Sequence, residues 1–331
     1  MLRQIPNLPA ADVKTGKDES ENEIIKKWGE PTKFLFEPKD HLAIGEALGI
    51  IDIERAAKVS GTRFYYLKGA GVVLEMALIQ LALKTLTKEG FIPVIPPVLI
   101  KKQAMAGMGY LEHGGEEDMY VLEKDGLFLV GTSEQSIGPM HMDEVLDGKK
   151  LPLRYMGFST CFRREAGAYG KDTRGILRVH QFDKVEMFSF TKPEESDKEH
   201  EFLLSLEEKL FQSLGIPYQV LKMCSGDLGA PAARKYDLEA WMPGQGKYRE
   251  VTSTSTCTDY QSRRLNIKYR EIKDQKPATN YVHILNGTAF AIGRTLIAIL
   301  ENNQQEDGSV LIPEVLRDYT GFEKISPSNS R

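Results

Sequence analysis

The sequence contains little cysteine. Its three cysteines, Cys161, Cys224 and Cys257, lie far apart, and no Cys-x-x-Cys pair occurs. This number and spacing exclude a disulfide framework and give no indication of a cysteine zinc site. A reducing compartment fits such a composition best, so we expect a cytoplasmic protein.

Features of secreted and membrane proteins are also missing. The segment Met1–Asn7 lacks the apolar stretch of a signal peptide, and no run of about 18 apolar residues indicates a membrane-spanning helix. The 331 residues include 43 basic and 47 acidic ones, which gives a net charge of −4. A general coat for nucleic acid would be basic, so any nucleic-acid contact needs a local patch. We therefore expect a soluble protein without a membrane partner.

The two common nucleotide-binding loops, Gly-x-Gly-x-x-Gly and Gly-x-x-x-x-Gly-Lys-Ser/Thr, are absent as well. The sequence shows instead a succession of strand-like segments, at 127–130, 154–163, 180–190, 218–223, 236–241, 248–255 and 282–285. Helices are predicted at about 72–89, 193–214 and 294–302. Many strands with few crossovers require a mainly antiparallel sheet, so we expect an α+β fold.

The boundaries of these elements have recognisable signals. The helix at 72–89 is apolar around most of its circumference, which indicates burial in a core or against a partner. Gly90 should end it, and the proline-rich segment 91–99 should be an edge or interface strand. Thr191 and Glu194 should form a capping box for the helix at 193–214.

The chain shows no internal repeat and no convincing linker. We expect a loosely structured lead-in at residues 1–30, one folded domain at 31–321 and a frayed tail at 322–331.

The segment 162–186 is the most informative one, because it is typical of a strand, a glycine-rich basic loop and a returning strand. The loop carries Lys171, Arg174 and Arg178, and arginine is a bidentate donor for phosphate oxygens. A solvated hairpin is the alternative. In the returning strand Lys184 and Glu186 share a face with phenylalanines, so they should face a ligand pocket or form a pair.

A second candidate phosphate site lies near the C-terminus. Arg294 falls in the first turn of the predicted helix, where a cation opposes the helix dipole unless an anion lies between them. Further polar groups stand at predicted strand ends, and each alone could be an ordinary polar turn. They are Thr132, Glu134, Glu250, Thr252 and Ser253.

Together these segments resemble the three signature motifs of the class II aminoacyl-tRNA synthetases, and within this class the seryl-tRNA synthetases. The stretches 90–97, 162–186 and 287–294 resemble motifs 1, 2 and 3. Other matching segments are Asn7-Leu-Pro, Phe36-Glu-Pro-Lys-Asp-His, Gly226-Asp-Leu-Gly and Leu285-Asn-Gly-Thr. The resemblance extends from about Ile5 to Gly321.

The resemblance implies a homodimeric catalytic domain that activates L-serine with ATP and Mg²⁺ and transfers it to tRNA(Ser), with tRNA(Sec) as a further candidate acceptor. It implies catalytic roles for Arg163, Glu165 and Arg294. The implied serine-binding residues are Thr132, Ser133, Glu134, Arg163, Glu186, Asn286 and Thr288. Those implied for ATP are Arg163, Arg164, Glu165, Val179, Glu250, Val251, Thr252, Ser253 and Arg294, with Glu250 and Ser253 also holding Mg²⁺.

Three features depart from the family pattern. Gln135–Gly138 replaces an expected Val-Pro-Leu-Thr run, and Ala289 replaces a usual glycine, which should crowd the backbone near ATP. The chain also begins where the family's coiled-coil arm would end, so we expect good activation of serine but poor charging of tRNA.

Two alternatives remain at this stage. One is an arm-less homologue that charges a carrier protein, and the other is a catalytically silent paralogue that serves as an interaction protein. Serine-dependent ATP–pyrophosphate exchange distinguishes the silent paralogue from both enzymes.

Overall fold

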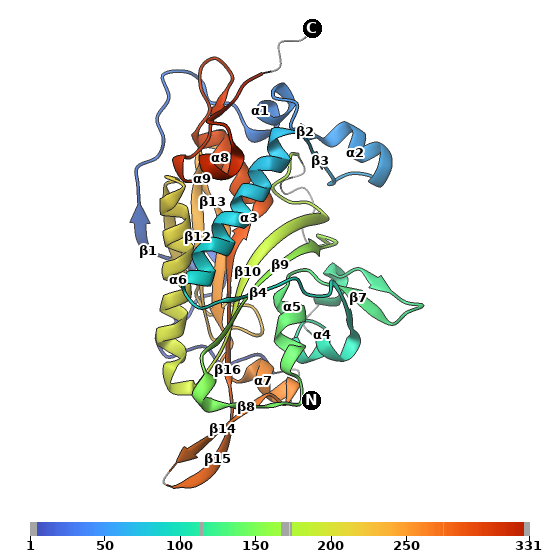
Figure 1. Ribbon diagram of the computed structural model, residues 1–331, viewed down its shortest axis with the longest axis vertical. Helices are drawn as coiled ribbons and strands as arrows, with labels where there is room; N and C mark the ends of the chain where they lie inside the picture. Colours follow the sequence, from blue (N-terminus) through green and yellow to red (C-terminus); the bar gives the residue numbers. More distant parts are fainter. Residues whose placement is uncertain (1–4, 113–114, 167–171, 173, 274, 328–331) are drawn as a thin grey trace.

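The computed structural model describes residues 5–112, 115–166, 172, 174–273 and 275–327. Its centre is an eight-stranded sheet in the order β1-β11-β12-β13-β16-β10-β9-β4 (Figure 1). The strands are β1 (Glu23–Trp28), β11 (Tyr218–Lys222), β12 (Arg234–Met242), β13 (Lys247–Thr256), β16 (His283–Ala291), β10 (Gln181–Thr191), β9 (Leu153–Phe162) and β4 (Ile92–Val94). All neighbours are antiparallel except β4 and β9, so the expected α+β class is confirmed.

Helices cover one face of this sheet and form the main core with it. They are α3 (Ala70–Lys88), α6 (Ser196–Ser213) and α8 (Ile292–Asn302), and in Figure 1 they lie in front of the strands. Val185 and Met187 of β10 point into this core. The alternate residues Glu186 and Phe188 point to the opposite face of the sheet. The two-residue period of the strands therefore separates an apolar face from a face that can hold polar groups.

Smaller elements complete the fold around the large sheet. The small sheets contain β2 (Ile51–Asp52), β3 (Tyr66–Leu67), β5 (Leu99–Lys101), β6 (Val121–Leu122), β7 (Leu127–Leu129), β8 (Val145–Asp147), β14 (Lys268–Lys273), β15 (Lys276–Tyr281), β17 (Val310–Leu311) and β18 (Lys324–Ile325). The remaining α-helices are α1 (His41–Ala47), α2 (Ile53–Ser60), α4 (Lys102–Met108), α5 (Glu134–Ile137), α7 (Tyr260–Leu265) and α9 (Glu314–Thr320). A second core cluster, which includes Phe188, Phe190 and Ile284, lies between the opposite face of the sheet and the small elements that pack on that face.

Several helix and strand signals are confirmed, and one is wrong. Gly90 and Gly215 have φ angles of 85° and 70° just after the predicted helices, as left-handed termination requires. The proline-rich segment supplies β4 at the sheet edge. Thr191 and Glu194 form no capping box, because Thr191 still belongs to β10 and no side chain caps α6 or the 3₁₀ turn before it.

The ends of the chain are more ordered than the sequence predicts. Residues 23–28 were expected in a loose lead-in, but they form the edge strand β1, which pairs with β11. Lys324–Ile325 was expected in a frayed tail, but it pairs with Val310–Leu311. The strand predicted at 282–285 was too short, since β16 continues through the small residues to Ala291 and leads directly into α8.

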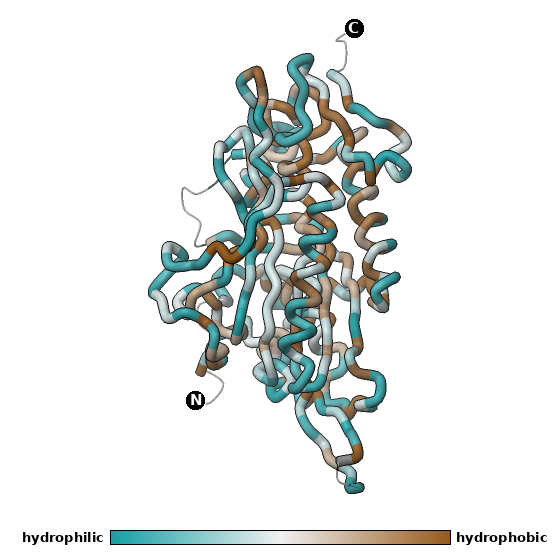
Figure 2. Tube along the Cα trace, turned by 90° about the vertical axis from the view of Figure 1, so that its left-hand side faces the viewer, coloured by the Kyte–Doolittle hydropathy of each residue, from teal (hydrophilic) through white to brown (hydrophobic). Residues whose placement is uncertain are grey.

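Helix α3 is long and apolar enough to cross a membrane when only length and composition are considered. Glu75, Gln80 and Lys84 nevertheless interrupt its apolar residues, so it is not an unbroken apolar run. Its inner side, with Leu74, Leu78 and Leu86, is fully buried in the main core. The helix is brown along most of its length at the right of Figure 2, and its other side is partly exposed. A core helix satisfies the same test, and the buried contacts favour that explanation.

The buried contact between α3 and β10 includes two carboxyl groups. Glu75 is 7% exposed. Burial, and then the hydrogen bond and charge of Asp183, raise the pKa of Glu75 to about 8. A free glutamate has a value of 4.5. The folded protein should therefore lose stability as the pH rises through this interval.

Replacing the carboxyl group of Glu75 should remove this pH-dependent loss of stability. Glu75→Gln should raise Tm clearly at about pH 8.5 and much less at about pH 5, because glutamine keeps a polar group without the charge. Thermal unfolding monitored by circular dichroism measures both values, with the exposed Glu46→Gln as the control. An equal shift of Tm at both pH values would contradict the raised pKa of Glu75 as the cause of the pH-dependent loss of stability.

Candidate active site

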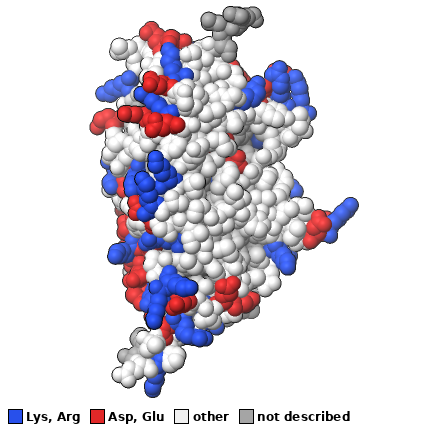
Figure 3. Space-filling model, in the orientation of Figure 1, with Lys and Arg blue, Asp and Glu red and all other residues white. Residues whose placement is uncertain are grey.

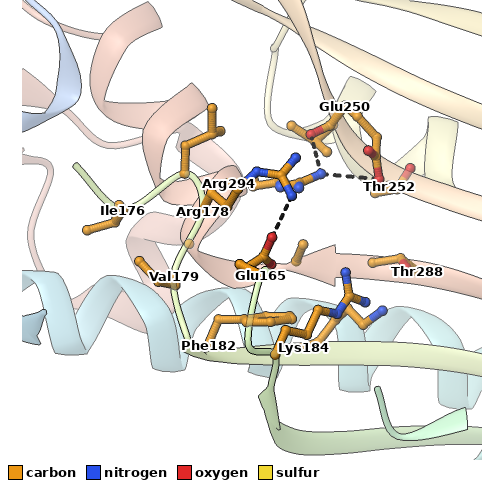
Figure 4. A pocket seen from close by; sticks show the side chains of 15 residues that line it. Glu165, Ile176, Arg178, Val179, Phe182, Lys184, Glu250, Thr252, Thr288 and Arg294 are labelled. Atoms are coloured by element: carbon orange, nitrogen blue, oxygen red, sulfur yellow. Dashed lines mark hydrogen bonds and ion pairs between the residues drawn. The ribbon is translucent and has the colours of Figure 1, made fainter. Parts of the chain in front are cut away.

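The ends of β9, β10, β13 and β16 surround a cavity of about 530 Å³. Its lining includes seven residues of the predicted ATP set, namely Arg163, Glu165, Val179, Glu250, Val251, Thr252 and Arg294. Figure 4 shows side chains from the 165–182 segment on one side and from β13 and α8 on the other. A concave site with a few converging charges is typical of small-molecule binding.

Arg163 lies at the end of β9 and is held from several sides. Its Nε donates to the Gly131 carbonyl at 3.2 Å, and its guanidinium lies 5.3 Å from the centre of the Phe182 ring. Its backbone N–H donates to the His180 carbonyl at 3.0 Å. These contacts fix a planar cation at the cavity wall, which is the geometry that recognises phosphate or carboxylate oxygens.

Glu165 has an unusual backbone, with a φ angle of 55°. A non-glycine residue keeps this left-handed conformation only where its surroundings hold it. Here the Arg178 guanidinium binds the Glu165 carboxylate at 2.5 Å, as the dashed line in Figure 4 shows. The conformation turns the carboxylate into the cavity instead of along the strand.

Arg294 in the first turn of α8 faces Glu250 of β13. Its guanidinium lies 3.1 Å from Glu250 Oε1 and also donates to the Glu250 carbonyl at 3.0 Å. Desolvation would raise the pKa of Glu250, but the charges of Arg294 and Lys235 lower it to about 2. The Glu250 carboxylate is thus kept ionised by three cations, of which Arg163 and Arg294 line this cavity.

A second cavity of about 870 Å³ adjoins the first, and Arg163, Lys184, Glu250 and Thr288 line both. Glu186 on β10 lies in its wall and is 2% exposed. Its Oε1 accepts hydrogen bonds from Thr288 at 3.0 Å and Thr132 at 3.2 Å, and it forms an ion pair with Lys184. Glu186 is therefore both paired and directed toward a cavity, so the two sequence-based readings are compatible.

Glu134 and Tyr110 form another close contact in the second cavity. Burial, and then the charge of Glu186, raise the pKa of Glu134. Burial and the neighbouring Glu134 also raise the pKa of Tyr110. A cationic group brought into this part of the cavity would relieve the repulsion between the two carboxylates.

The remaining predicted residues are distributed unevenly. Asn286, predicted for serine, and Ser253, predicted for ATP and Mg²⁺, both line the second cavity. Ser133 does not, because its fully buried side chain points to the Gly157 carbonyl of β9. Arg164 turns away from the ATP cavity, donates to the Met119 carbonyl at 2.9 Å and packs on the Tyr120 ring. Neither side chain therefore points into its predicted cavity in this structure, and both assignments remain predictions.

Two further expectations need correction. The Thr252 hydroxyl donates to Glu207 beneath the sheet, so this residue reaches the cavity only with its other atoms. Ala289 is fully buried in the main core, so its methyl group does not crowd the ATP cavity. Arg174 is exposed, and Lys171 lies outside the described residues.

Sequence reasoning also missed cavity residues. Phe182 lines the first cavity, and Tyr110, Lys235 and Gln261 line the second. For Phe182 the strand period offered a usable signal, since it shares a face of β10 with Lys184 and Glu186. Lys235 lies on β12, which carries no predicted site residue. Tyr110 follows α4 far from every motif, and its sequence context contains no comparable signal.

Comparisons with known proteins agree with this geometry. The model of the tRNA synthetase class II core domain (G, H, P, S and T) matches residues 120–303. The serine–tRNA ligase of Dictyoglomus thermophilum is 53% identical over 98% of this chain and 76% of its own length. The corresponding protein of Streptomyces coelicolor is 54% identical with the same coverage. The chain belongs to the seryl-tRNA synthetase family.

Solved structures of seryl-tRNA synthetases are also similar to this chain. The Pyrococcus horikoshii enzyme, solved in complex with ATP, has 48% identity and a TM-score of 0.94 over 99% of this chain and 77% of its own. The cytoplasmic enzyme of Naegleria fowleri, solved with AMP, has 39% identity and a TM-score of 0.92, and the match covers 99% of this chain and 78% of that one. The family and fold implied by the motifs are thereby confirmed.

The charge pairing in the first cavity gives a prediction that needs no ligand. Arg294→Met should raise the pKa of Glu250 from about 2 toward its ordinary value of 4.5, because the nearest cation is lost. Carbon-13 NMR of labelled glutamate side chains should then show Glu250 titrating as the protein is acidified. The surface variant Arg263→Met should leave the titration curve of Glu250 unchanged. If Arg294→Met does not change this curve either, Lys235 and Arg163 are enough to keep the pKa of Glu250 low, and the prediction is contradicted.

Proposed function

We propose that this chain activates L-serine with ATP and transfers the seryl group to the 3′ end of tRNA(Ser). The observation that carries this proposal is the wall shared by the two cavities, where Arg163, Lys184, Glu250 and Thr288 face both. A nucleotide in the first cavity and a small amino acid in the second would meet at Arg163. The relatives named above are serine–tRNA ligases, which favours tRNA over a carrier protein as acceptor.

The first cavity would hold ATP. Arg163 would bind the α-phosphate, Glu165 the adenine amino group, and Arg294 the outermost phosphate. In the structure Glu165 and Arg294 are paired with Arg178 and Glu250, so the ligand would compete for these ion pairs. Phe182 offers an aromatic surface beside Arg163 for the adenine ring. The serine carboxylate would attack the α-phosphate in line and release pyrophosphate, while the fixed cations stabilise the developing charge.

Mg²⁺ would be held by Glu250 and Ser253. Both donors are oxygen atoms, as Mg²⁺ prefers, and the low pKa of Glu250 keeps its carboxylate ionised. Among the described residues no group of three or more His, Cys, Asp or Glu side chains could hold a metal ion. This small donor set fits a metal whose remaining ligands are phosphates and water. The ion would neutralise phosphate charge.

The second cavity would hold serine. Glu186 and Thr288 would contact its hydroxyl group, and Thr132 and Glu134 would lie near its ammonium group. A cation beside Glu134 would relieve the repulsion that raises its pKa. Sites built to hydrogen-bond a hydroxyl reject analogues without one by about 10⁴-fold or more. Alanine should therefore be a very poor substrate.

The decisive experiment is ATP–pyrophosphate exchange over a panel of amino acids, followed by acceptor tests with tRNA(Ser), tRNA(Sec) and a carrier protein. Serine alone should support rapid exchange. Arg163→Ala should lower the rate about 10²–10³-fold, because one preorganised charge donor is lost at the transition state. Near-normal exchange by this variant would contradict the role of Arg163, and exchange with another amino acid would contradict the serine pocket.

Glu186→Ala distinguishes a serine contact from a purely structural pair with Lys184. The proposed contact predicts a large increase in KM for serine and a small change in KM for ATP. A structural pair predicts loss of thermal stability and of ATP affinity, with KM for serine unchanged. Steady-state exchange kinetics and thermal unfolding of the same preparation separate these outcomes.

The uncovered side of α3 supports a homodimer. Val72, Met76 and Leu83 on this helix are 40%, 43% and 38% exposed, and Ile95 after β4 is 85% exposed. Figure 3 shows a broad uncharged area in the middle of this face, with charged side chains gathered at its margins. A twofold axis through α3 and β4 would cover these residues and the open edge of the sheet together.

The dimer prediction is tested by placing a charge on this area. The parent chain should sediment as a dimer at micromolar concentration, and Met76→Glu should sediment as a monomer, because a carboxylate would be buried without a partner. Val59→Glu, on exposed α2, is the matched control and should remain dimeric. A monomeric parent in analytical ultracentrifugation would contradict the proposal.

A further inference from the structure

We propose that Gln135 is a positioning residue for Arg163 and that it acts through the backbone of Gly131. This inference rests on the proposed function, and it concerns the segment where the sequence departs from the family pattern. Gln135 lies in the short helix α5, and its side chain is buried, with the residue only 3% exposed. Its Oε1 accepts a hydrogen bond from the Gly131 N–H at 2.8 Å.

The same glycine holds the arginine. The Gly131 carbonyl accepts the hydrogen bond from Arg163 Nε at 3.2 Å. Glycine has more backbone freedom than any other residue, so the direction of this carbonyl depends on how its neighbours are fixed. On one side the Val130 carbonyl accepts from the Phe162 N–H at 2.8 Å, and on the other Gln135 fixes the Gly131 N–H.

The arrangement divides the work of the guanidinium group. Nε anchors the side chain, whereas the two terminal nitrogens form no hydrogen bond or ion pair with the part of the chain that the structure describes. These nitrogens are therefore available for phosphate and carboxylate oxygens at the wall shared by the two cavities. A rotated Gly131 carbonyl would leave the positive charge in place but misdirect the fork of donors.

The variant Gln135→Met tests this arrangement, because methionine has a similar shape but cannot accept a strong hydrogen bond. We expect kcat for serine-dependent exchange to fall about 10-fold, since small misplacements of a catalytic group have effects of 10²-fold or less. Affinity for a non-hydrolysable 5′-sulfamoyl analogue of seryl-adenylate should fall by a similar factor.

Gln304→Met is the matched control. Gln304 is 4% exposed, and its Oε1 likewise accepts a backbone N–H, that of Lys39, at 2.8 Å, but it does not line either cavity. Both variants should lose stability, because each leaves a partly buried backbone N–H without its acceptor. Only Gln135→Met should lose analogue affinity. Equal analogue affinity in the two variants and the parent would overturn the proposal.

A double-mutant cycle separates positioning of Arg163 from a general effect on the pocket. Arg163→Lys removes the Nε donor, so adding Gln135→Met should cause no further loss of analogue affinity. A full additional 10-fold loss would show that Gln135 acts independently of Arg163 and would overturn the proposal. If the parent itself gives no exchange, the proposed function has failed. The ATP affinity of the same variants still tests the positioning role, because Gln135→Met should weaken ATP binding and Gln304→Met should not.

Discussion

The strict alternation of side chains across one antiparallel sheet is the constraint on which the site depends. In β10, Val185 and Met187 must remain in the core beneath α3, α6 and α8, so Lys184 and Glu186 must face the opposite side. A one-residue slip would move both charges into the apolar core and turn the core residues toward the cavity. The packing of α3, α6 and α8 on one face thus determines the position of groups on the other face.

Neighbouring strands apply the same constraint in register. The pairing of β10 with β16 places Glu186 opposite Thr288, and the hydrogen bond between them crosses this pair. The register shifts at Val185/Glu186 because β16 carries one extra residue there, Ala289, so β16 is locally irregular where Thr288 meets the carboxylate. Irregularities of this kind are frequent beside active sites, because they redirect a side chain without disturbing the remaining ladder.

Much of this architecture could be predicted from the sequence, and the failures have physical causes. Strand period and helix termination depend on local residues, so β10, α3 and the ends marked by Gly90 and Gly215 were predictable. β1 was not, because its mostly exposed residues show no alternation and it is held by its partner β11. The direction of the Ser133 side chain was not predictable for a similar reason, since only tertiary packing on Gly157 determines it.

The charges of the first cavity follow a further pattern, because every cation described in its lining except Arg163 has a carboxylate partner. Arg178 binds Glu165, Arg294 binds Glu250, and Lys184 binds Glu186. A buried or half-buried charge without such a partner would destabilise the fold. These pairs therefore keep the side chains ordered before a ligand arrives. Arg163 differs from them, because a ring and a carbonyl oxygen hold it and its terminal donors stay available. The residue that faces both cavities is thus ordered by uncharged groups, and a phosphate need not displace a carboxylate to reach it.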